Sequence, residues 1–287
     1  MRVDDLYKEY AKKIINSGYD EENKNLDVRA KWDNGKKAYA IYLPQLIFEY
    51  DENEVPITSL RKIARKTAIK ELLRIYKDKS NDVNYLEENY GVKYWNKWKK
   101  EDGTLGKAYG YQVGKNFISP ENKKNTNQIE RLIYNLKNDP LNRRHIIDLY
   151  DVDDAHEMSL IPCAFLTMWT VTEDKLNMTL IQRSGDFLAA ASPGGINEFQ
   201  YYVLLRMICA VCNLKPGKFV HFVQNAHIYK KHIPIIKEII EKDVKNTSNP
   251  KLILNPKIKN FNDFTIKDFS LENYNPNIEK YNIEIAE

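Results

Sequence analysis

Cys163 is the residue in this sequence whose side chain is best suited to act as a nucleophile. It follows Pro162 at the start of an apolar stretch that reads as a strand. A thiol is the most nucleophilic neutral side chain, and nearby cations are needed to hold it as a thiolate at neutral pH. Free cysteines are more often buried in a core, so Cys163 taken alone leaves both roles open.

A second candidate is the pair Cys209 and Cys212, which has the Cys-x-x-Cys spacing of redox and metal sites. Both lie inside an apolar helical segment, and no second cysteine or histidine pair accompanies them. Because a structural zinc site needs four ligands, we expect no metal and predict that both cysteines pack in the core. An odd number of cysteines also argues against a disulfide framework.

Arginines stand at the ends of two predicted strands, where they could bind a phosphate. Arg143 and Arg144 open one strand, and Arg183 follows another in the run QRSGD. A guanidinium group gives bidentate hydrogen bonds to phosphate oxygens, and the hydroxyl of Ser184 can bind a further oxygen. A solvated face is the ordinary alternative for an arginine pair. The same positive charges could hold Cys163 as a thiolate.

Two further segments could recognise a sugar and a flat ring. His227 and Tyr229 lie on one face of a predicted strand because side chains alternate along it, and together they could hydrogen-bond a ribose hydroxyl. Trp95 and Trp98, with polar residues between them, could stack on a heterocycle. A structural histidine and core tryptophans are the alternatives, and spacing alone does not decide between them.

The elements that must position these residues predict an α+β fold. Amphipathic spacing predicts helices, and runs of β-branched and aromatic residues predict strands. The expected helices cover residues 65–77, 128–140, 197–212 and 233–241, and the expected strands cover residues 143–151, 163–171, 175–184 and 218–229. Without a repeat or a compositional break, we expect a single domain over residues 1–287, with a large mixed β-sheet flanked by helices.

The composition excludes several classes of protein. The chain has 287 residues, of which 43% are hydrophobic and 29% charged, and its net charge is +4 without a long basic run. We therefore expect no nucleic-acid partner. Nothing approaches the run of about 18 apolar residues that a membrane span requires. The first residues also lack the pattern of a signal peptide, so we expect a cytoplasmic protein that does not contact a membrane.

Taken together, these segments closely resemble the thymidylate synthase family over nearly the whole chain. The matching pieces, in order, are DVRAKWDNG around Arg29, TAIKELL with Glu71, SNDVN, WNKWKKEDGTLGKAYGYQ, NDPLNRRHI, LIPCAFLTMWTV, QRSGD, AHIYKKHI and FTIKDFSLENY. Each motif alone is modest, but their number and order identify the family. The resemblance implies a homodimer, with the sheet at the dimer interface, that methylates dUMP to dTMP. The carbon donor and reductant would be 5,10-methylenetetrahydrofolate.

The resemblance also implies a role for each matched residue. Cys163 would attack C6 of the uracil, Glu71 would organise the waters that move protons, and Tyr109 would lie near C5 for its deprotonation. The phosphate would be bound by Arg29, Arg183 and Ser184, and the phosphate in the partner's site by Arg143 and Arg144. The ribose would be held by His227 and Tyr229, and the uracil edge would be read by Asn197. The folate would be contacted by Trp95, Trp98, Asp186 and Ala286. Asp186 would also take part in catalysis.

The role of Asn197 depends on how one loop is aligned. Between Asp186 and Asn197 the chain carries FLAAASPGGI, which is longer than the usual loop of the family. Aligning on Gln200 places Asn197 at the position that reads the uracil edge, whereas aligning on Pro193 would place Gly195 there. An asparagine amide can donate to O4 and accept from N3–H of uracil.

Other departures lie around the base and folate pockets. Ala164 stands where a histidine often follows the cysteine, Tyr150 replaces a usual tryptophan, and Gln224-Asn225 replaces Gly-Asp. Where the family normally has an apolar tail, this sequence has Ile285-Ala286-Glu287. These differences leave open a second hypothesis, a deoxypyrimidine monophosphate (dUMP or dCMP) hydroxymethylase of the same superfamily, in which water replaces the hydride. A third hypothesis, a non-catalytic relative that binds nucleotide or RNA, is opposed by the retained nucleophile.

Overall fold

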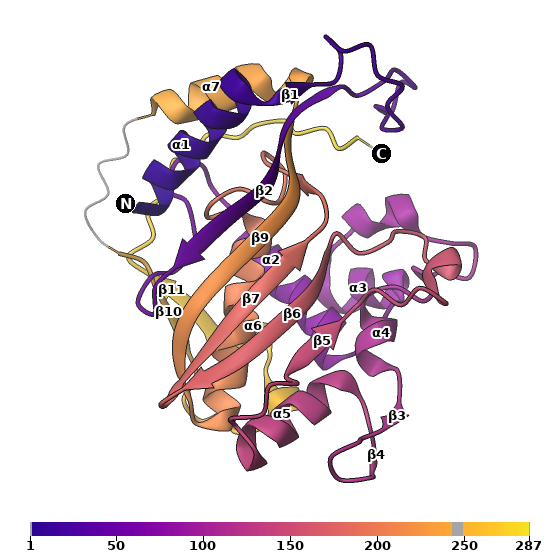
Figure 1. The fold of residues 1–287 in the computed structure, drawn as a ribbon, viewed down its shortest axis with the longest axis vertical. Coiled ribbons are helices and arrows are strands. Elements are labelled where there is room, and N and C mark those ends of the chain that lie inside the picture. The colour runs from indigo at the N-terminus through magenta and orange to yellow at the C-terminus, as the bar shows by residue number, and fades with distance from the viewer. Residues whose placement is uncertain (1, 243–248, 287) are drawn as a thin grey trace.

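The computed structural model describes residues 2–242 and 249–286, and a mixed β-sheet forms its centre (Figure 1). The strand order is β1 (Tyr19–Asp20), β2 (Ala40–Tyr50), β9 (Lys215–Tyr229), β7 (Lys175–Gln182), β6 (Ala164–Thr172) and β5 (Ile146–Asp148), with β8 (Gly185–Asp186) also paired to β9. Strands β7 and β8 run parallel to β9, and the other neighbours are antiparallel. A parallel pair needs a crossover connection, and the chain between β8 and β9 provides a long helix there.

Figure 1 shows the main helices gathered behind the sheet and around its ends. The helices are α1 (Arg2–Ser17), α2 (Arg65–Leu72), α3 (Val83–Tyr90), α4 (Gly110–Gly114), α5 (Gln128–Asn138), α6 (Ile196–Cys212) and α7 (Ile233–Glu241). Helix α2 continues as one turn of π-helix, Leu73–Lys77. Two small hairpins pair β3 (Phe117–Ile118) with β4 (Asn125–Thr126), and β10 (Lys251–Leu254) with β11 (Phe269–Glu272).

Helix α6 is the centre of the core, because it is apolar on almost every side. A helix with that composition is stable only where it is buried all round. It packs between the inner face of the sheet and α2, and twelve of its seventeen residues are buried. Cys209 is buried on this helix and Cys212 is half-buried, so the expected core role is confirmed. In the described part of the chain, no group of side chains could hold a metal ion.

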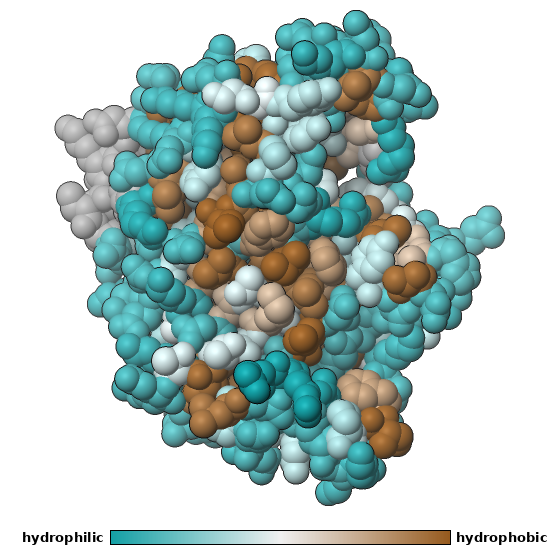
Figure 2. All heavy atoms as spheres, viewed as in Figure 1, coloured by the Kyte–Doolittle hydropathy of each residue, from teal (hydrophilic) through white to brown (hydrophobic). Residues whose placement is uncertain are grey.

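The other face of the sheet carries apolar side chains that no helix in residues 2–242 and 249–286 covers. Figure 2 looks onto this face, and hydrophobic residues fill its middle. Two cross-strand rows make up the patch, one of Ile146, Met168, Thr179 and Val220, and the other of Leu166, Ile181, Phe222 and Ile47. Ile47, Ile146 and Met168 are exposed by 47%, 42% and 39%. The name outer sheet face is used below for these two rows.

The predicted single-domain α+β fold is confirmed, with the predicted helices in place. The strand expected over 143–151 is shorter, since only Ile146–Asp148 pairs with β6. Strand β2 was not predicted, although it pairs with β9 along almost its whole length. Its sequence contains Pro44, which argues against a strand, and Gln45 adopts a left-handed φ of 58°. Among the described helices, none is both long and apolar enough to cross a membrane.

The packing of α6 predicts a large loss of stability when its buried side chains are shortened. We expect Ile208→Ala, at a position with no exposed surface, to lower the free energy of unfolding by about 2–5 kcal/mol. The matched control Ile278→Ala removes the same atoms from a side chain that is 79% exposed, and should stay within about 0.5 kcal/mol of wild type. Urea unfolding at one protein concentration measures both. A loss below 0.5 kcal/mol in Ile208→Ala would contradict this packing.

Candidate active site

The register between β6 and β7 brings Cys163 and Arg183 together. Ala164 pairs with Gln182, so the next residue outward on each strand is Cys163 on one and Arg183 on the other. The Arg183 backbone N–H donates to the Cys163 carbonyl oxygen at 2.9 Å. The exposed Arg183 guanidinium then bends back, and it donates to the carbonyl oxygens of Ile161 at 2.8 Å and Pro162 at 3.1 Å.

Two opposing effects set the protonation of the Cys163 thiol. The side chain is half-buried, and burial raises the thiol pKa because it disfavours the charged form. The positive charges of Arg183 and Arg29 lower that pKa, but in the single chain burial prevails. Arg29 reaches the site from an exposed loop. The site therefore needs further positive charge before Cys163 is largely ionised at neutral pH.

The pairing of β8 with β9 places Asp186 opposite His227. One Asp186 oxygen accepts the backbone N–H groups of Leu188 at 2.9 Å and Ala189 at 3.1 Å. Its other oxygen is buried and has no hydrogen-bond partner among the described residues. That oxygen is free to accept a hydrogen bond from a ligand.

His227 and Tyr229 lie side by side at the end of β9, as the strand alternation predicted. Their ring centroids are 4.9 Å apart. Burial lowers the pKa of His227, so its ring is neutral at neutral pH, and Nδ1 lies 3.0 Å from the Asn225 side-chain oxygen. Burial also raises the pKa of Tyr229 to about 12, with smaller contributions from Asp186 and Cys163. Both groups thus remain neutral hydrogen-bonding partners.

Glu71 and Tyr109 approach Cys163 from the helical layer. Glu71 is 9% exposed near the end of α2, and burial raises its pKa. Tyr109 has a left-handed φ of 51°, which costs free energy in a residue other than glycine and is common at functional sites. A Cβ on the next residue, Gly110, would lie 2.2 Å from the Ser80 carbonyl oxygen. Burial, followed by the charges of Cys163 and Glu71, raises the pKa of Tyr109.

Two polar residues beside Glu71 were missed in the sequence. The Tyr94 hydroxyl donates to the Glu71 carboxylate. Arg74, in the π-helical turn, has no exposed surface, and its guanidinium lies 5.1 Å from the centre of the Trp95 ring. Its charge lowers the Glu71 pKa and partly offsets burial. The only signal for Arg74 was an arginine on the apolar side of a predicted helix.

Asn197 lies in the first turn of α6 and faces the end of β7. Its side-chain N–H donates to the Gln182 side-chain oxygen at 3.1 Å. Gly195, the alternative position, has no side chain, and a Cβ there would lie 2.7 Å from the Ala190 carbonyl oxygen. Asn197 is therefore the residue whose amide contacts Gln182, the residue before Arg183.

Trp95 packs against Trp98 and Tyr109, and the C-terminal segment contacts Lys97, which lies between the two tryptophans. Trp95 is only 4% exposed, and its ring lies 5.5 Å from Trp98 and 5.0 Å from Tyr109. In the ligand-free chain, Trp95 is thus a core residue. Trp98 and Ala286 are half-buried. Next to Ala286, the Ile285 carbonyl oxygen accepts from the Lys97 ammonium at 3.2 Å, whereas Glu287 lies outside the described residues.

Arg143 and Arg144 do not join the other site residues of the same chain. They are exposed and precede β5. Because β5 is antiparallel to β6 and pairs Ile146 with Met168, Arg144 falls near the level of Thr170. That level is seven positions along β6 from Cys163, roughly 23 Å at about 3.3 Å per residue. The two arginines therefore lie at the opposite end of the strand from the thiol.

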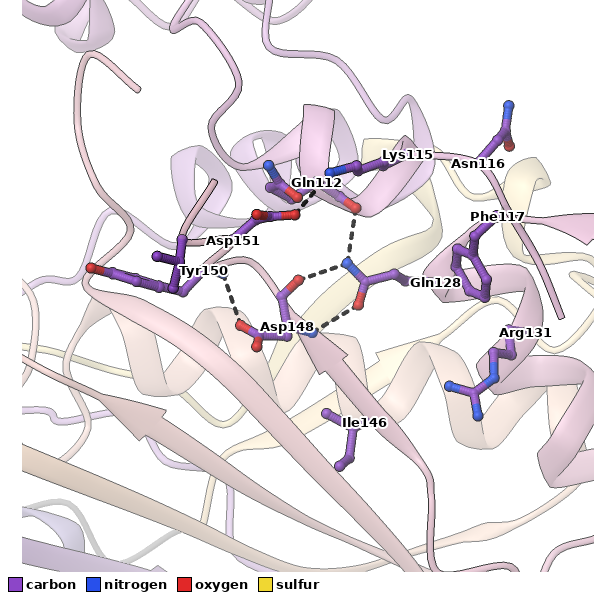
Figure 3. Close-up of a pocket in the computed structure, with 11 residues that line it drawn as sticks. Gln112, Lys115, Asn116, Phe117, Gln128, Arg131, Ile146, Asp148, Tyr150 and Asp151 are labelled. Carbon is purple, nitrogen blue, oxygen red and sulfur yellow. Dashed lines mark hydrogen bonds and ion pairs between the residues drawn. The ribbon is translucent and has the colours of Figure 1, made fainter. Parts of the chain in front are cut away.

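A cavity of about 490 Å³ lies between α4, α5 and β5 and is separate from these residues. Figure 3 shows the Gln128 side chain bridging two backbone segments there. It donates to the carbonyl oxygens of Gln112 at 2.9 Å and Asp148 at 2.6 Å, and accepts from the Asp148 N–H at 2.8 Å. None of the predicted site residues lines this cavity. Its contacts hold α4, and so the turn at Tyr109, against the sheet.

Comparison with known proteins gives one consistent result. The family model described as thymidylate synthase matches residues 5–287. The chain is 42% identical over 274 residues to a thymidylate synthase of Bacillus subtilis subsp. natto, with 95% of each chain covered. It is 40% identical over 272 residues to one of Clostridium beijerinckii, with 94% of each covered. The structure of thermostable thymidylate synthase A from Bacillus subtilis superposes with a TM-score of 0.90 at 41% identity, covering 99% of each chain.

The electrostatics of Cys163 predict a specific pH dependence of its alkylation. The apparent pKa for its reaction with iodoacetamide should rise in Arg183→Ala relative to wild type, since the variant loses a charge that favours the thiolate. In Arg183→Lys it should rise less. Peptide mapping separates Cys163 from Cys212 and Cys209, whose thiol pKa values burial raises to about 11 and about 12. An unchanged or lower apparent pKa in Arg183→Ala would contradict the assignment.

Proposed function

This chain belongs to the thymidylate synthase family, and we propose that it methylates dUMP to dTMP with Cys163 as its nucleophile. The co-substrate is 5,10-methylenetetrahydrofolate, which supplies the one-carbon unit and a hydride and leaves as dihydrofolate. One observation carries the assignment of the site. A half-buried thiol lies beside an exposed arginine, with the amide of Asn197 one hydrogen bond beyond Gln182.

The proposed reaction begins with a bond between the Cys163 sulfur and C6 of the uracil. The electron pair of the C5–C6 double bond then makes C5 a nucleophile, and C5 bonds to the one-carbon unit as the bond of that carbon to one folate nitrogen breaks. Loss of the C5 proton breaks the bond to the other folate nitrogen and leaves an exocyclic methylene. Hydride from the tetrahydrofolate adds to that methylene, and the electrons re-form the C5–C6 double bond as the thiolate leaves C6. Burial keeps the Tyr109 hydroxyl protonated. Placed near Cys163, it would relay the C5 proton by accepting it as its own hydroxyl proton passes to a neighbouring water. Burial raises the pKa of Glu71, which makes its carboxylate a stronger base than an ordinary one.

Arg183, Ser184 and Arg29 are the proposed phosphate ligands within the chain. Arg183 uses two of the five N–H bonds of its guanidinium on carbonyl oxygens, and the others are available. A phosphate dianion beside the thiol would raise the thiol pKa further. Additional cations are therefore needed, and we propose that Arg143 and Arg144 of a second copy supply them, since in their own chain they lie at the far end of β6.

The outer sheet face is the proposed contact with that second copy. Exposed apolar patches of this kind usually mark protein–protein interfaces. The patch spans β2, β9, β7, β6 and β5 (Figure 2), and β5 is the strand that follows Arg143 and Arg144. A homodimer through this face would bury the patch and would carry the two arginines toward the neighbouring site.

Asp186, Trp95, Trp98 and Ala286 are the proposed folate contacts. The unpartnered Asp186 oxygen suits an N–H of a pterin ring. Trp95 would contact the folate only through the edge of its indole ring, because the rest of the ring is packed in the core. Described residues provide no feature that favours the hydroxymethylase hypothesis. We propose a cytoplasmic location, because a thiol nucleophile and three unpaired cysteines suit a reducing compartment.

The proposed role of Cys163 predicts loss of turnover without loss of nucleotide binding. In Cys163→Ser, formation of dTMP and dihydrofolate should fall by more than about a thousandfold, because an alcohol is a far weaker nucleophile than a thiolate. Binding of dUMP, measured by calorimetry, should stay within about tenfold of wild type (1.4 kcal/mol). The matched control is Cys212→Ser, which should keep turnover. Turnover close to wild type in Cys163→Ser would disprove the mechanism.

The proposed sharing of arginines predicts that two inactive variants restore activity when mixed. The double variant Arg143→Ala/Arg144→Ala inactivates the site of the neighbouring copy. Cys163→Ser inactivates the site of the chain that carries it. After subunit exchange, half of the dimers would be mixed and each would hold one intact site, giving about a quarter of wild-type activity.

The control for this mixing experiment is Cys163→Ser with Arg183→Ala, two defects that each spoil the site of their own chain. This pair should stay inactive after exchange. Equal recovery in both mixtures, or none in either while mixed dimers form, would count against shared sites.

A further inference from the structure

A single asparagine does not by itself tell uracil from cytosine. Uracil presents an acceptor at O4 and a donor at N3–H, whereas cytosine presents a donor at its amino group and an acceptor at N3. The amide of Asn197 matches uracil in one orientation and cytosine after a half-turn about its last bond. Selection of uracil therefore requires that the rest of the protein fix the orientation of this amide.

Gln182 receives the Asn197 amide, and its own orientation is fixed by a backbone group. Its side-chain nitrogen donates to the Ser184 carbonyl oxygen at 2.9 Å, and a carbonyl oxygen can only accept. The Gln182 side-chain oxygen must then point the other way, where it accepts from Asn197 at 3.1 Å. Gln182 is 1% exposed, so no water competes for this contact.

His221 contacts the same Gln182 side-chain oxygen that accepts from Asn197. Its Nε2 lies 2.9 Å from that oxygen, so Nε2 must carry a hydrogen, because two lone pairs would repel each other. Its Nδ1 lies 3.1 Å from a Glu198 oxygen. Whether the proton between Nδ1 and Glu198 belongs to the ring or to the carboxyl group, Nε2 remains a donor toward Gln182.

Glu198 is anchored by two groups that donate to it. The Tyr50 hydroxyl and the Gly194 N–H, the latter at 2.6 Å, both reach its second oxygen. Glu198 and His221 have no exposed surface. Gly194 has a left-handed φ of 68°, and a Cβ there would lie 2.3 Å from the Thr58 nitrogen. The extended loop after Asp186 thus delivers a backbone N–H to this carboxyl group.

We propose that Glu198 and His221 form a buried relay that acts through Gln182 to lock the Asn197 amide in the orientation that accepts uracil and rejects cytosine. The relay consists of positioning residues, since none of the three touches the base. The inference rests on the proposed function, in which Asn197 reads the base. It assigns a role in base selection to the extended loop, which supplies Gly194.

The test compares the dissociation constants of dUMP and dCMP at neutral pH, measured by calorimetry on the full chain. Wild type should bind dUMP far more tightly than dCMP. His221→Phe removes the Nε2–H donor, and Gln182→Met removes the contact with Asn197. In both variants the ratio of dCMP to dUMP dissociation constants should fall by about tenfold or more, because the amide is free to turn.

The conservative control is Glu198→Gln. Its amide oxygen can accept from Tyr50 and Gly194, and its NH2 group can donate to Nδ1 of the His221 tautomer that carries hydrogen on Nε2. The ratio should therefore stay within about twofold of wild type. If these residues served folding alone, their substitution would weaken the binding of dUMP and dCMP equally and leave the ratio of the two dissociation constants unchanged.

The outcomes separate this inference from the proposed function. If wild type prefers dUMP and the folded His221→Phe and Gln182→Met variants keep its ratio, the relay is wrong and the function stands. If His221→Phe fails to fold, Gln182→Met alone decides. If wild type itself binds dUMP no better than dCMP, the proposed function fails and the relay has no base to select.

Discussion

The register of β7 between β6 and β9 is the constraint on which the rest of the site depends. It sets Gln182 beside Ala164 on one side and beside Val223 on the other, with its side chain turned inward toward α6. Arg183 then follows at the strand end next to Cys163. Because side chains alternate along a strand, a slip of one residue would exchange the inner and outer faces. The buried α6 prevents such a slip by filling the inner face with apolar side chains.

Charge balance is the reason for proposing that one chain does not provide a complete site. Burial around Cys163 suits addition to a neutral base, but it raises the thiol pKa, and a bound phosphate would raise it again. The arginines of the same chain only partly compensate. Glu71 shows the same balance, since burial raises its pKa while Tyr94 and Arg74 lower it. In the proposed dimer, assembly through the outer sheet face would supply the missing positive charge and would couple activity to association.

Most of the fold could be predicted from the sequence, because periodicity carries it. The roles of the site residues came from the family resemblance and stay predictions. Strand β2 could not be predicted, since Pro44 and the left-handed Gln45 interrupt its pattern. The polar residues next to Trp95 suggested that its ring could stack on a heterocycle, but in the structure the ring packs against Tyr109 and Arg74. The contacts of Glu198 with Tyr50 and His221 join residues far apart in the sequence. Such contacts leave no periodic or motif signal, and only the tertiary structure reveals them.

The central claim is that Cys163 bonds to the nucleotide during turnover. The most direct measurement is rapid acid quenching of a single turnover with dUMP and 5,10-methylenetetrahydrofolate, followed by digestion and mass spectrometry of the peptides. At intermediate times, the peptide that contains Cys163 should carry the mass of the nucleotide, alone or with the folate, and this species should disappear as dTMP forms. Product formation without an adduct at any time, or an adduct on Cys212 instead, would contradict the account.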